Sequence, residues 1–160
     1  MNAAECAKTI ALASRIAGTV NLFKIQFPDV RTDLKPWLND ADTRDLIDPE
    51  SIDLGFHFPG YSRACACRSI LVQIRLFHDP YHDGFSDRTK AEAIDLNPRV
   101  IGLDLAGYDH RGQQWRLSTI ESWQFVGETT PRSEPAEKLK HFSRDVFQLF
   151  NDPGTTAAIA

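Results

Sequence analysis

The sequence predicts an α+β fold in which a four-stranded, mainly antiparallel sheet carries N-terminal and C-terminal helices on one face. The residues from 68 to 77 alternate Ile70, Val72, Ile74 and Leu76 with more polar side chains, which is typical of a strand with one buried face. Further alternating stretches surround it, and strong helical periodicity occurs only near the two ends of the chain. A run of strands between terminal helices favours an α+β arrangement.

The N-terminal helix is expected to run from residue 3 to about residue 26. Pro28 should end it, because the residue before a proline is driven out of the helical region. Lys8, Arg15 and Asn21 fall outside its apolar stripe and should face solvent. The stripe recurs at steps of three and four residues and comprises Ile10, Ala13, Ala17, Val20, Phe23 and Phe27.

The stretch from 28 to 50 is acidic and is expected to form a loop with a short helix from Asp40 to Ile47. A calcium site here is not supported, because the carboxylates lack the alternation and the central glycine of an EF-hand loop. The first strand is expected at 51–58 and should stop at Pro59 and Gly60.

The later strands are expected at 100–106, with Ile101, Leu103 and Leu105 inward, and at 114 to about 125. A tight hairpin should join them, with Gly112 in a positive-φ conformation. A bulge within 119–122 would explain the break in alternation in the last strand. A short helix is expected between residue 87 and about residue 96.

The C-terminal helix is expected from Ser133, as its N-cap, to about Phe150. Leu139, Phe142, Val146 and Leu149 form its apolar stripe. With 160 residues, the chain is expected to form one domain over 1–154 followed by a frayed tail, 155–160.

Composition argues against several classes of partner. The net charge of −4 disfavours nucleic acid and anionic membranes, which attract basic surfaces. The three cysteines, Cys6, Cys65 and Cys67, are best explained as reduced packing residues in a cytoplasmic protein. Charged residues interrupt the apolar N-terminal stretch, so neither a signal peptide nor a membrane-spanning helix is expected.

The sheet face opposite the helices is the main functional hypothesis. It would be open, and glycine, alanine or serine at 55, 102, 106 and 118 would let a partner approach its backbone. The chain is therefore expected to be a non-catalytic adaptor or assembly factor that binds another protein, or itself, through this face or a sheet edge. The alternative is that the charged residues merely pair across strands. The binding residues would be Asp53, His57, Leu71, Gln73, Arg75, Asp104 and Arg116.

An enzymatic alternative rests on the loop after residue 77. His78 and His82, with Asp79 and Asp83, offer ligands for a transition metal in a hydrolase or oxygenase. Pro80 argues against the helix that would bring both histidines to one side. His57, Cys65 and Cys67 could add ligands. No other cofactor is indicated, because phosphate-loop and dinucleotide fingerprints are absent from the sequence.

Overall fold

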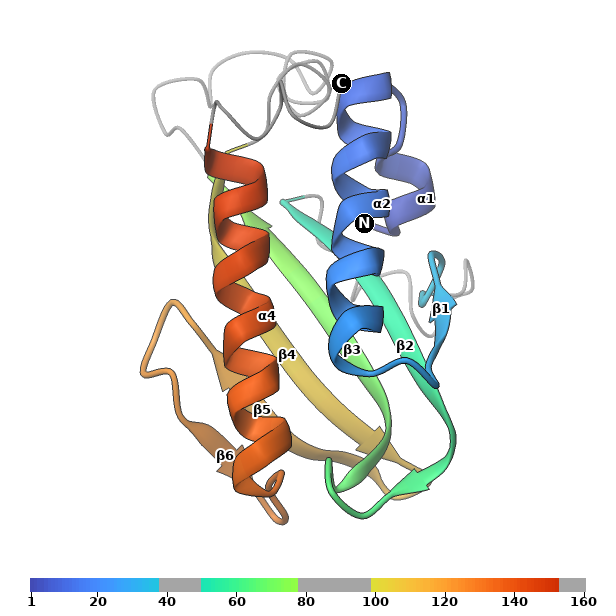
Figure 1. Cartoon of the computed structure of the whole chain (residues 1–160), viewed down its shortest axis with the longest axis vertical. Coiled ribbons are helices and arrows are strands. Elements are labelled where there is room, and N and C mark those ends of the chain that lie inside the picture. Colours follow the sequence, from blue (N-terminus) through green and yellow to red (C-terminus); the bar gives the residue numbers. More distant parts are fainter. Residues whose placement is uncertain (38–49, 78–98, 153–160) are drawn as a thin grey trace.

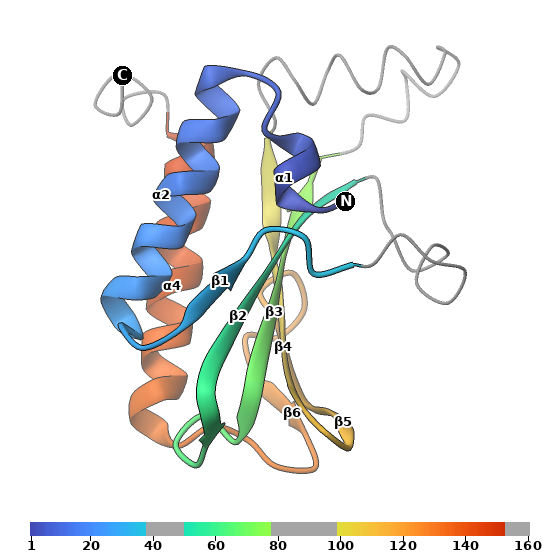
Figure 2. The same ribbon diagram turned by 90° about the vertical axis from the view of Figure 1, so that its right-hand side faces the viewer.

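The computed structural model describes residues 1–37, 50–77 and 99–152, which form two layers (Figure 1). One layer is a six-stranded sheet, and the other contains the helices α2 and α4 side by side on one face of it. Figure 2 shows the sheet nearly edge-on, with both long helices on the same side. In chain order the elements are α1 (Ala3–Cys6), α2 (Ile10–Gln26), β1 (Arg31–Asp33), β2 (Ser51–Ser62), β3 (Cys67–Leu76), β4 (Val100–Asp109), β5 (Gly112–Ser118), β6 (Phe125–Gly127) and α4 (Ser133–Asn151).

The α+β class and the antiparallel sheet are confirmed, but the sheet has six strands instead of four. Its order is β1-β2-β3-β4-β5-β6, with each strand antiparallel to the next. The two outermost strands, β1 and β6, have three residues each, which is too short for alternation to reveal. The stretch expected to be a bulge is instead a turn. It reverses the chain from β5 into β6, with Trp123 at φ 58°.

The other strand predictions are partly right. β3 and β4 lie where alternation placed them, and Gly112 has φ 109° in the β4–β5 hairpin. β2 does not stop at Pro59 but continues to Ser62, because the regular ladder is interrupted between His57 and Ser62 and requires no N–H from the proline. Ile101 is 47% exposed instead of inward, since the β3–β4 register shifts beside it.

The N-terminal helix divides in two, and of its expected stripe only Phe23 and Phe27 are buried. Thr9 begins α2 by accepting a hydrogen bond from the backbone N–H of Leu12. Ile10 is 89% exposed, whereas Arg15 is buried with its guanidinium 5.9 Å from the Phe150 ring centroid. The apolar residues of α2 are distributed around most of its circumference, so periodicity could not identify which side of the helix is buried. The buried residues are Leu12, Arg15, Ile16, Thr19 and Phe23.

The stripe of α4 is confirmed, since Leu139, Phe142, Val146 and Leu149 are all buried. Its N-cap is Arg132, one residue earlier than expected, and no side chain caps the helix. None of the described helices is long and apolar enough to cross a membrane. The short helices expected at 40–47 and 87–96 and the tail at 155–160 lie outside the described residues.

The core lies between the helices and the inner face of the sheet. Phe23 of α2 stacks on Phe56 of β2, with ring centroids 3.8 Å apart, and meets Phe142 of α4 edge-on at 5.1 Å. A Cβ atom at Gly18 would lie 3.0 Å from Leu149, so the glycine allows α2 and α4 to approach closely. Aromatic contacts therefore join α2 to the sheet and α4 to α2.

We expect Phe23→Ala to lower the free energy of unfolding by about 3–5 kcal/mol, because it leaves a cavity where three elements meet. The measurement is urea denaturation followed by circular dichroism. Ile25→Ala in the same helix removes a side chain that is 71% exposed and should change stability by less than about 0.5 kcal/mol. Equal losses in the two variants would contradict this account of the core.

Candidate functional site: the outer face of the sheet

The outer face is the face of the sheet opposite α2 and α4. One row of residues crosses it in continuous register from the first strand to the last. Leu71 and Ala106, near its middle, are half-buried, while Arg116 is exposed and Val126 is 68% exposed. We call this the central row: Asp33, Gly55, Leu71, Ala106, Arg116 and Val126.

An ion-paired cluster lies beside the central row. The Asp104 carboxylate accepts from Arg75 Nε at 2.8 Å and lies 3.4 Å from Arg116 Nη2. Arg116 also lies 3.5 Å from Glu121 Oε1. The cross-strand pairing of arginine with aspartate, the alternative to a docking face, is therefore present at Asp104, whereas Asp53 pairs with the N-terminal amine instead. A cross-strand pair of opposite charges is worth about 0.2–1 kcal/mol. Gln73, opposite Asp104 in the register, completes this part of the face.

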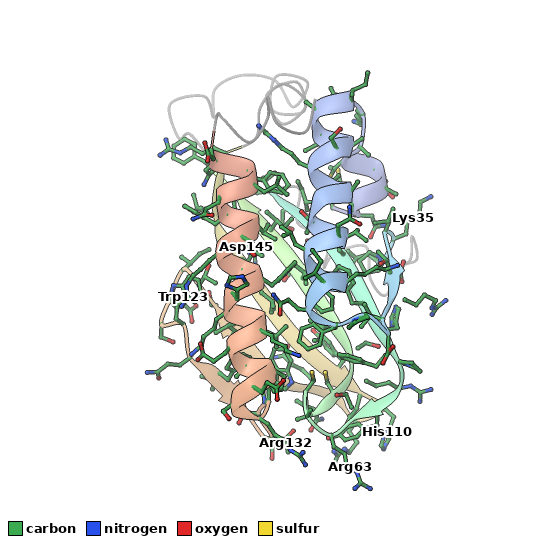
Figure 3. The ribbon with its side chains drawn as sticks, viewed as in Figure 1. Lys35, Arg63, His110, Trp123, Arg132 and Asp145 are labelled. Atoms are coloured by element: carbon green, nitrogen blue, oxygen red, sulfur yellow. The ribbon has the colours of Figure 1, made fainter. Side chains whose placement is uncertain are left out.

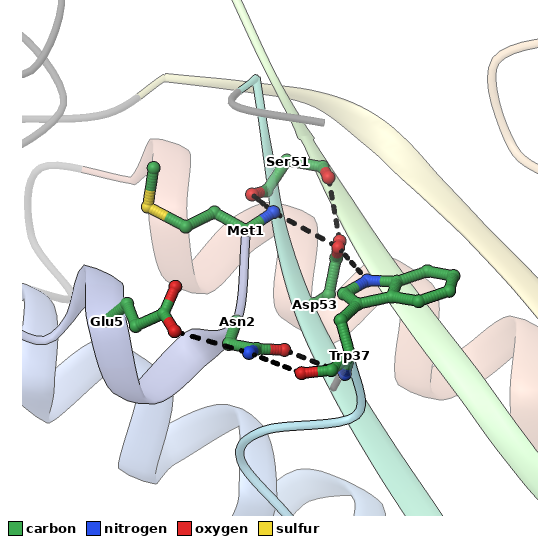
Figure 4. Close-up of polar contacts among 6 residues, drawn as sticks. All are labelled: Met1, Asn2, Glu5, Trp37, Ser51 and Asp53. Atoms are coloured by element: carbon green, nitrogen blue, oxygen red, sulfur yellow. Dashed lines mark hydrogen bonds and ion pairs between the residues drawn. The ribbon is translucent and has the colours of Figure 1, made fainter. Parts of the chain in front are cut away.

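Asp53 does not belong to the open surface, contrary to the prediction. Its side chain is completely buried and accepts hydrogen bonds from Trp37 Nε1 and from Ser51 Oγ at 2.7 Å (Figure 4). The amine of Met1 lies 3.1 Å away, and Asn2 exchanges hydrogen bonds with the Trp37 backbone. Alternation shows which face a residue occupies, but not that another segment covers that face.

The glycines of this face accommodate the protein's own loops, which corrects the expectation that they admit a partner. A Cβ at Gly55 would lie 3.5 Å from Pro36, in the segment after β1. A Cβ at Gly102 would lie 2.6 Å from the side chain of Ile120, in the turn after β5. Ser118 is buried as well. The accessible part of the central row therefore runs from Leu71 to Val126.

His57 joins two residues that the sequence did not connect with it. Its Nδ1 lies 2.7 Å from Ser69 Oγ, and its Nε2 lies 3.3 Å from Asp33 Oδ2. Since the three-residue strand containing Asp33 gave no detectable pattern, no sequence signal could have found this group. Ser69 lies in a strand that is paired on both sides. The backbone N–H groups near it therefore form hydrogen bonds to the neighbouring strands and do not form an oxyanion hole. The group therefore lacks the donors that acyl transfer requires.

A cavity of about 370 Å³ opens next to His57, at the end of β1, β2 and β3. Arg31 and Arg68 on its walls are exposed, and neither forms an ion pair with another described residue. Its other walls are both polar and apolar. They are formed by Asp29, His57, Phe58, Pro59 and Ser69.

The metal hypothesis is not tested, because His78, Asp79, His82 and Asp83 lie outside the described residues. Within 1–37, 50–77 and 99–152, no group of three or more histidine, cysteine or acidic residues could hold a metal ion. Cys65 and Cys67, considered as additional ligands, are buried free thiols. His57 instead contacts Ser69 and Asp33.

All three cysteines are buried, as expected of packing residues. Burial raises the pKa of Cys6 to about 11, an effect that the positive charge at the N-terminus only partly opposes. Burial likewise raises the pKa values of Cys65 and Cys67. The thiols are therefore protonated at neutral pH, which is unfavourable for nucleophilic or redox chemistry.

These features define an α+β protein with a helix-covered inner face and a partly open, ion-paired outer face. The chain belongs to a family described as a domain of unknown function, whose model matches residues 4–152. No curated protein and no solved structure matches this chain.

We expect Asp53→Ala to lower the free energy of unfolding by about 2–4 kcal/mol, because it leaves the donors of Trp37 and Ser51 without their acceptor. The measurement is urea denaturation at pH 7. Asp29→Ala, which removes an exposed carboxylate without a described ion pair, is the control and should change little. A loss below about 1 kcal/mol for Asp53→Ala would contradict the structural role.

Stability should fall above pH 9. In the unfolded chain the Cys6 thiol ionises near its ordinary pKa of 9.0, whereas in the folded protein it stays protonated to about 11. Rising pH therefore stabilises the unfolded chain first. Cys6 alone should lower the free energy of unfolding by about 2–3 kcal/mol between these values. In denaturation series at pH 8–11, Cys6→Ala should show a shallower decline, and an unchanged slope would contradict the assignment.

Proposed function

We propose that this protein is a non-catalytic binding module that holds a second protein chain against the outer face of its sheet. The observation that supports this proposal most directly is the accessible part of the central row. Leu71, Ala106, Arg116 and Val126 lie on four consecutive strands, and no described helix covers them. With strands about 4.8 Å apart, this surface spans about 14 Å.

The chemistry of this face favours binding over catalysis. Its charged side chains point to one another: Asp104 lies between Arg75 and Arg116, and Glu121 balances Arg116. A catalytic group is normally directed at a site where a reacting atom can lie. Here the neutralised charges lie beside the apolar side chains of the central row, and protein interfaces commonly combine such apolar and polar groups.

The edges of the sheet are less suitable for a partner than its face. β1 and β6 have three residues each, and Gly127 at the end of β6 has φ 155°. Short, irregular edge strands discourage pairing with another chain. A partner should therefore lie across the strands and present an apolar patch to Leu71, Ala106 and Val126.

Site-specific crosslinking tests the proposal. A photoreactive residue in place of Val126 should capture a protein in cells, whereas the same residue in place of Ile25, on the exposed surface of α2, should not. The captured protein is then purified for calorimetry. We expect Leu71→Arg and Val126→Arg each to weaken binding at least tenfold, while Ile25→Arg, at a position that is 71% exposed, leaves it unchanged.

Two results would contradict the proposal. One is a capture pattern that does not differ between positions 126 and 25. The other is a purified partner whose affinity is the same for the outer-face variants and the wild type. If the captured protein is a second copy of this chain, sedimentation should show a dimer that Val126→Arg dissociates.

A further inference from the structure

We propose that the cavity between Arg31 and Arg68 binds a carboxylate side chain of the partner protein, next to an apolar residue of that partner. This inference rests on the proposed function and specifies which part of a partner the outer face recognises. The cavity is continuous with the central row, because Ser69 on its wall and Leu71 in the row are two positions apart on the same face of β3. Two positions along a strand correspond to about 7 Å.

The two guanidinium groups are the strongest evidence for an acidic ligand. Several arginines of the sheet and its hairpins have partners within the protein: Arg111 lies 3.0 Å from Asp109, and Arg116 pairs with Asp104 and Glu121. Arg31 and Arg68, in contrast, line one cavity without an ion pair to any described residue. The planar fork of a guanidinium matches the two oxygens of a carboxylate.

The remaining walls indicate what accompanies the carboxylate. Phe58 and Pro59 provide an apolar wall, and the Phe58 ring is held edge-on against Phe27, with centroids 6.0 Å apart. A cavity of about 370 Å³ is at the small end of the range for ligand sites and has room for one or two side chains. An aspartate or glutamate beside an aliphatic or aromatic residue fits both walls.

Two carboxylates lie at or next to the cavity, Asp29 on its wall and Asp33 behind His57, and they have different roles. Asp33 is engaged by His57 and accepts a hydrogen bond from the backbone N–H of Lys35 at 2.9 Å. Asp29 has no described ion pair and opposes a bound anion. Two arginines therefore outnumber one unengaged carboxylate. Replacing Asp29 should strengthen binding of an acidic ligand, whereas it would weaken binding of a ligand that also carries a positive charge.

The surrounding surface supports the approach of an acidic segment. Figure 3 shows Arg63, His110 and Arg132 at the end of the molecule where the β2–β3 and β4–β5 hairpins meet the start of α4. The cavity lies towards the same end, beside the last residues of β2 and the first of β3. Arginine side chains close to a site attract acidic segments and speed their association, even on a chain with net negative charge.

The test begins with a phage-displayed library of random peptides panned on the full chain. We expect the selected peptides to share an aspartate or glutamate within two positions of an apolar residue. Binding of one such peptide is then measured by fluorescence polarisation. Arg31→Gln and Arg68→Gln should each weaken it about tenfold, and Asp29→Asn should strengthen it two- to fivefold. Lys24→Gln on α2 is the matched control and should have no effect, with folding of all variants checked by circular dichroism.

Several outcomes would overturn the inference: selected peptides without an acidic residue, equal affinities for the wild type and both arginine variants, or weaker binding by Asp29→Asn. Inorganic phosphate that binds this cavity below about 1 mM and displaces the peptide would assign it to a free anion instead. If Leu71→Arg reduces partner binding while Arg31→Gln and Arg68→Gln do not, the proposed function stands and only the carboxylate site fails.

Discussion

The packing of Phe23 against Phe56 and Phe142 is the constraint on which the rest of the structure depends. It joins α2, β2 and α4 on the inner face, and Gly18 lets Leu149 of α4 approach α2 closely. Because both long helices are committed to this face, they cannot also cover the outer face. The opening of the outer face, where we propose that a partner binds, is thus a consequence of how the core is built.

The outer face must be compatible with water when no partner is bound. Its charges meet this need by pairing across strands, with Asp104 between Arg75 and Arg116. Placing a partner over such pairs removes water from them, and that cost is recovered only if the partner supplies suitable hydrogen bonds. Under the proposed function, the same ion-paired cluster would therefore also select among partners.

Alternation and helical periodicity predicted the elements whose burial repeats over many residues. β3, with Ile70, Val72 and Ile74 inward, and α4, with Phe142 and Val146 inward, are examples. Periodicity could not find three-residue strands, nor choose a side of α2, where Arg15 is buried and Ile10 exposed. Both limits arise because local pattern reports burial only when one face is clearly more apolar than the other.

The candidate site was harder to predict than the strands, because its structure depends on contacts between segments that are distant in the sequence. Parity correctly placed Leu71, Gln73, Arg75, Asp104 and Arg116 on one face, because antiparallel register follows from the alternation of each strand. Parity failed for Asp53, because Trp37, sixteen positions earlier in the chain, covers it. Parity also could not predict the contact between Asp33 and His57. A loop that covers a site has no periodic sequence pattern, so its position can be known only from the structure.

The coverage of the outer face determines where a partner can lie. Pro36 and Trp37 close the face over β2, and Ile120 closes it over Gly102. What remains open is a band of two neighbouring rows: the accessible central row from Leu71 to Val126, and the row of Arg31, His57 and Ser69 beside the cavity. Contacts with the central row alone would allow a partner to shift along it, whereas an acidic side chain of the partner fixed at one end would set its position. In the proposed complex, the two arginines at the cavity would thus fix the position of the partner, which the flat part of the face cannot do alone.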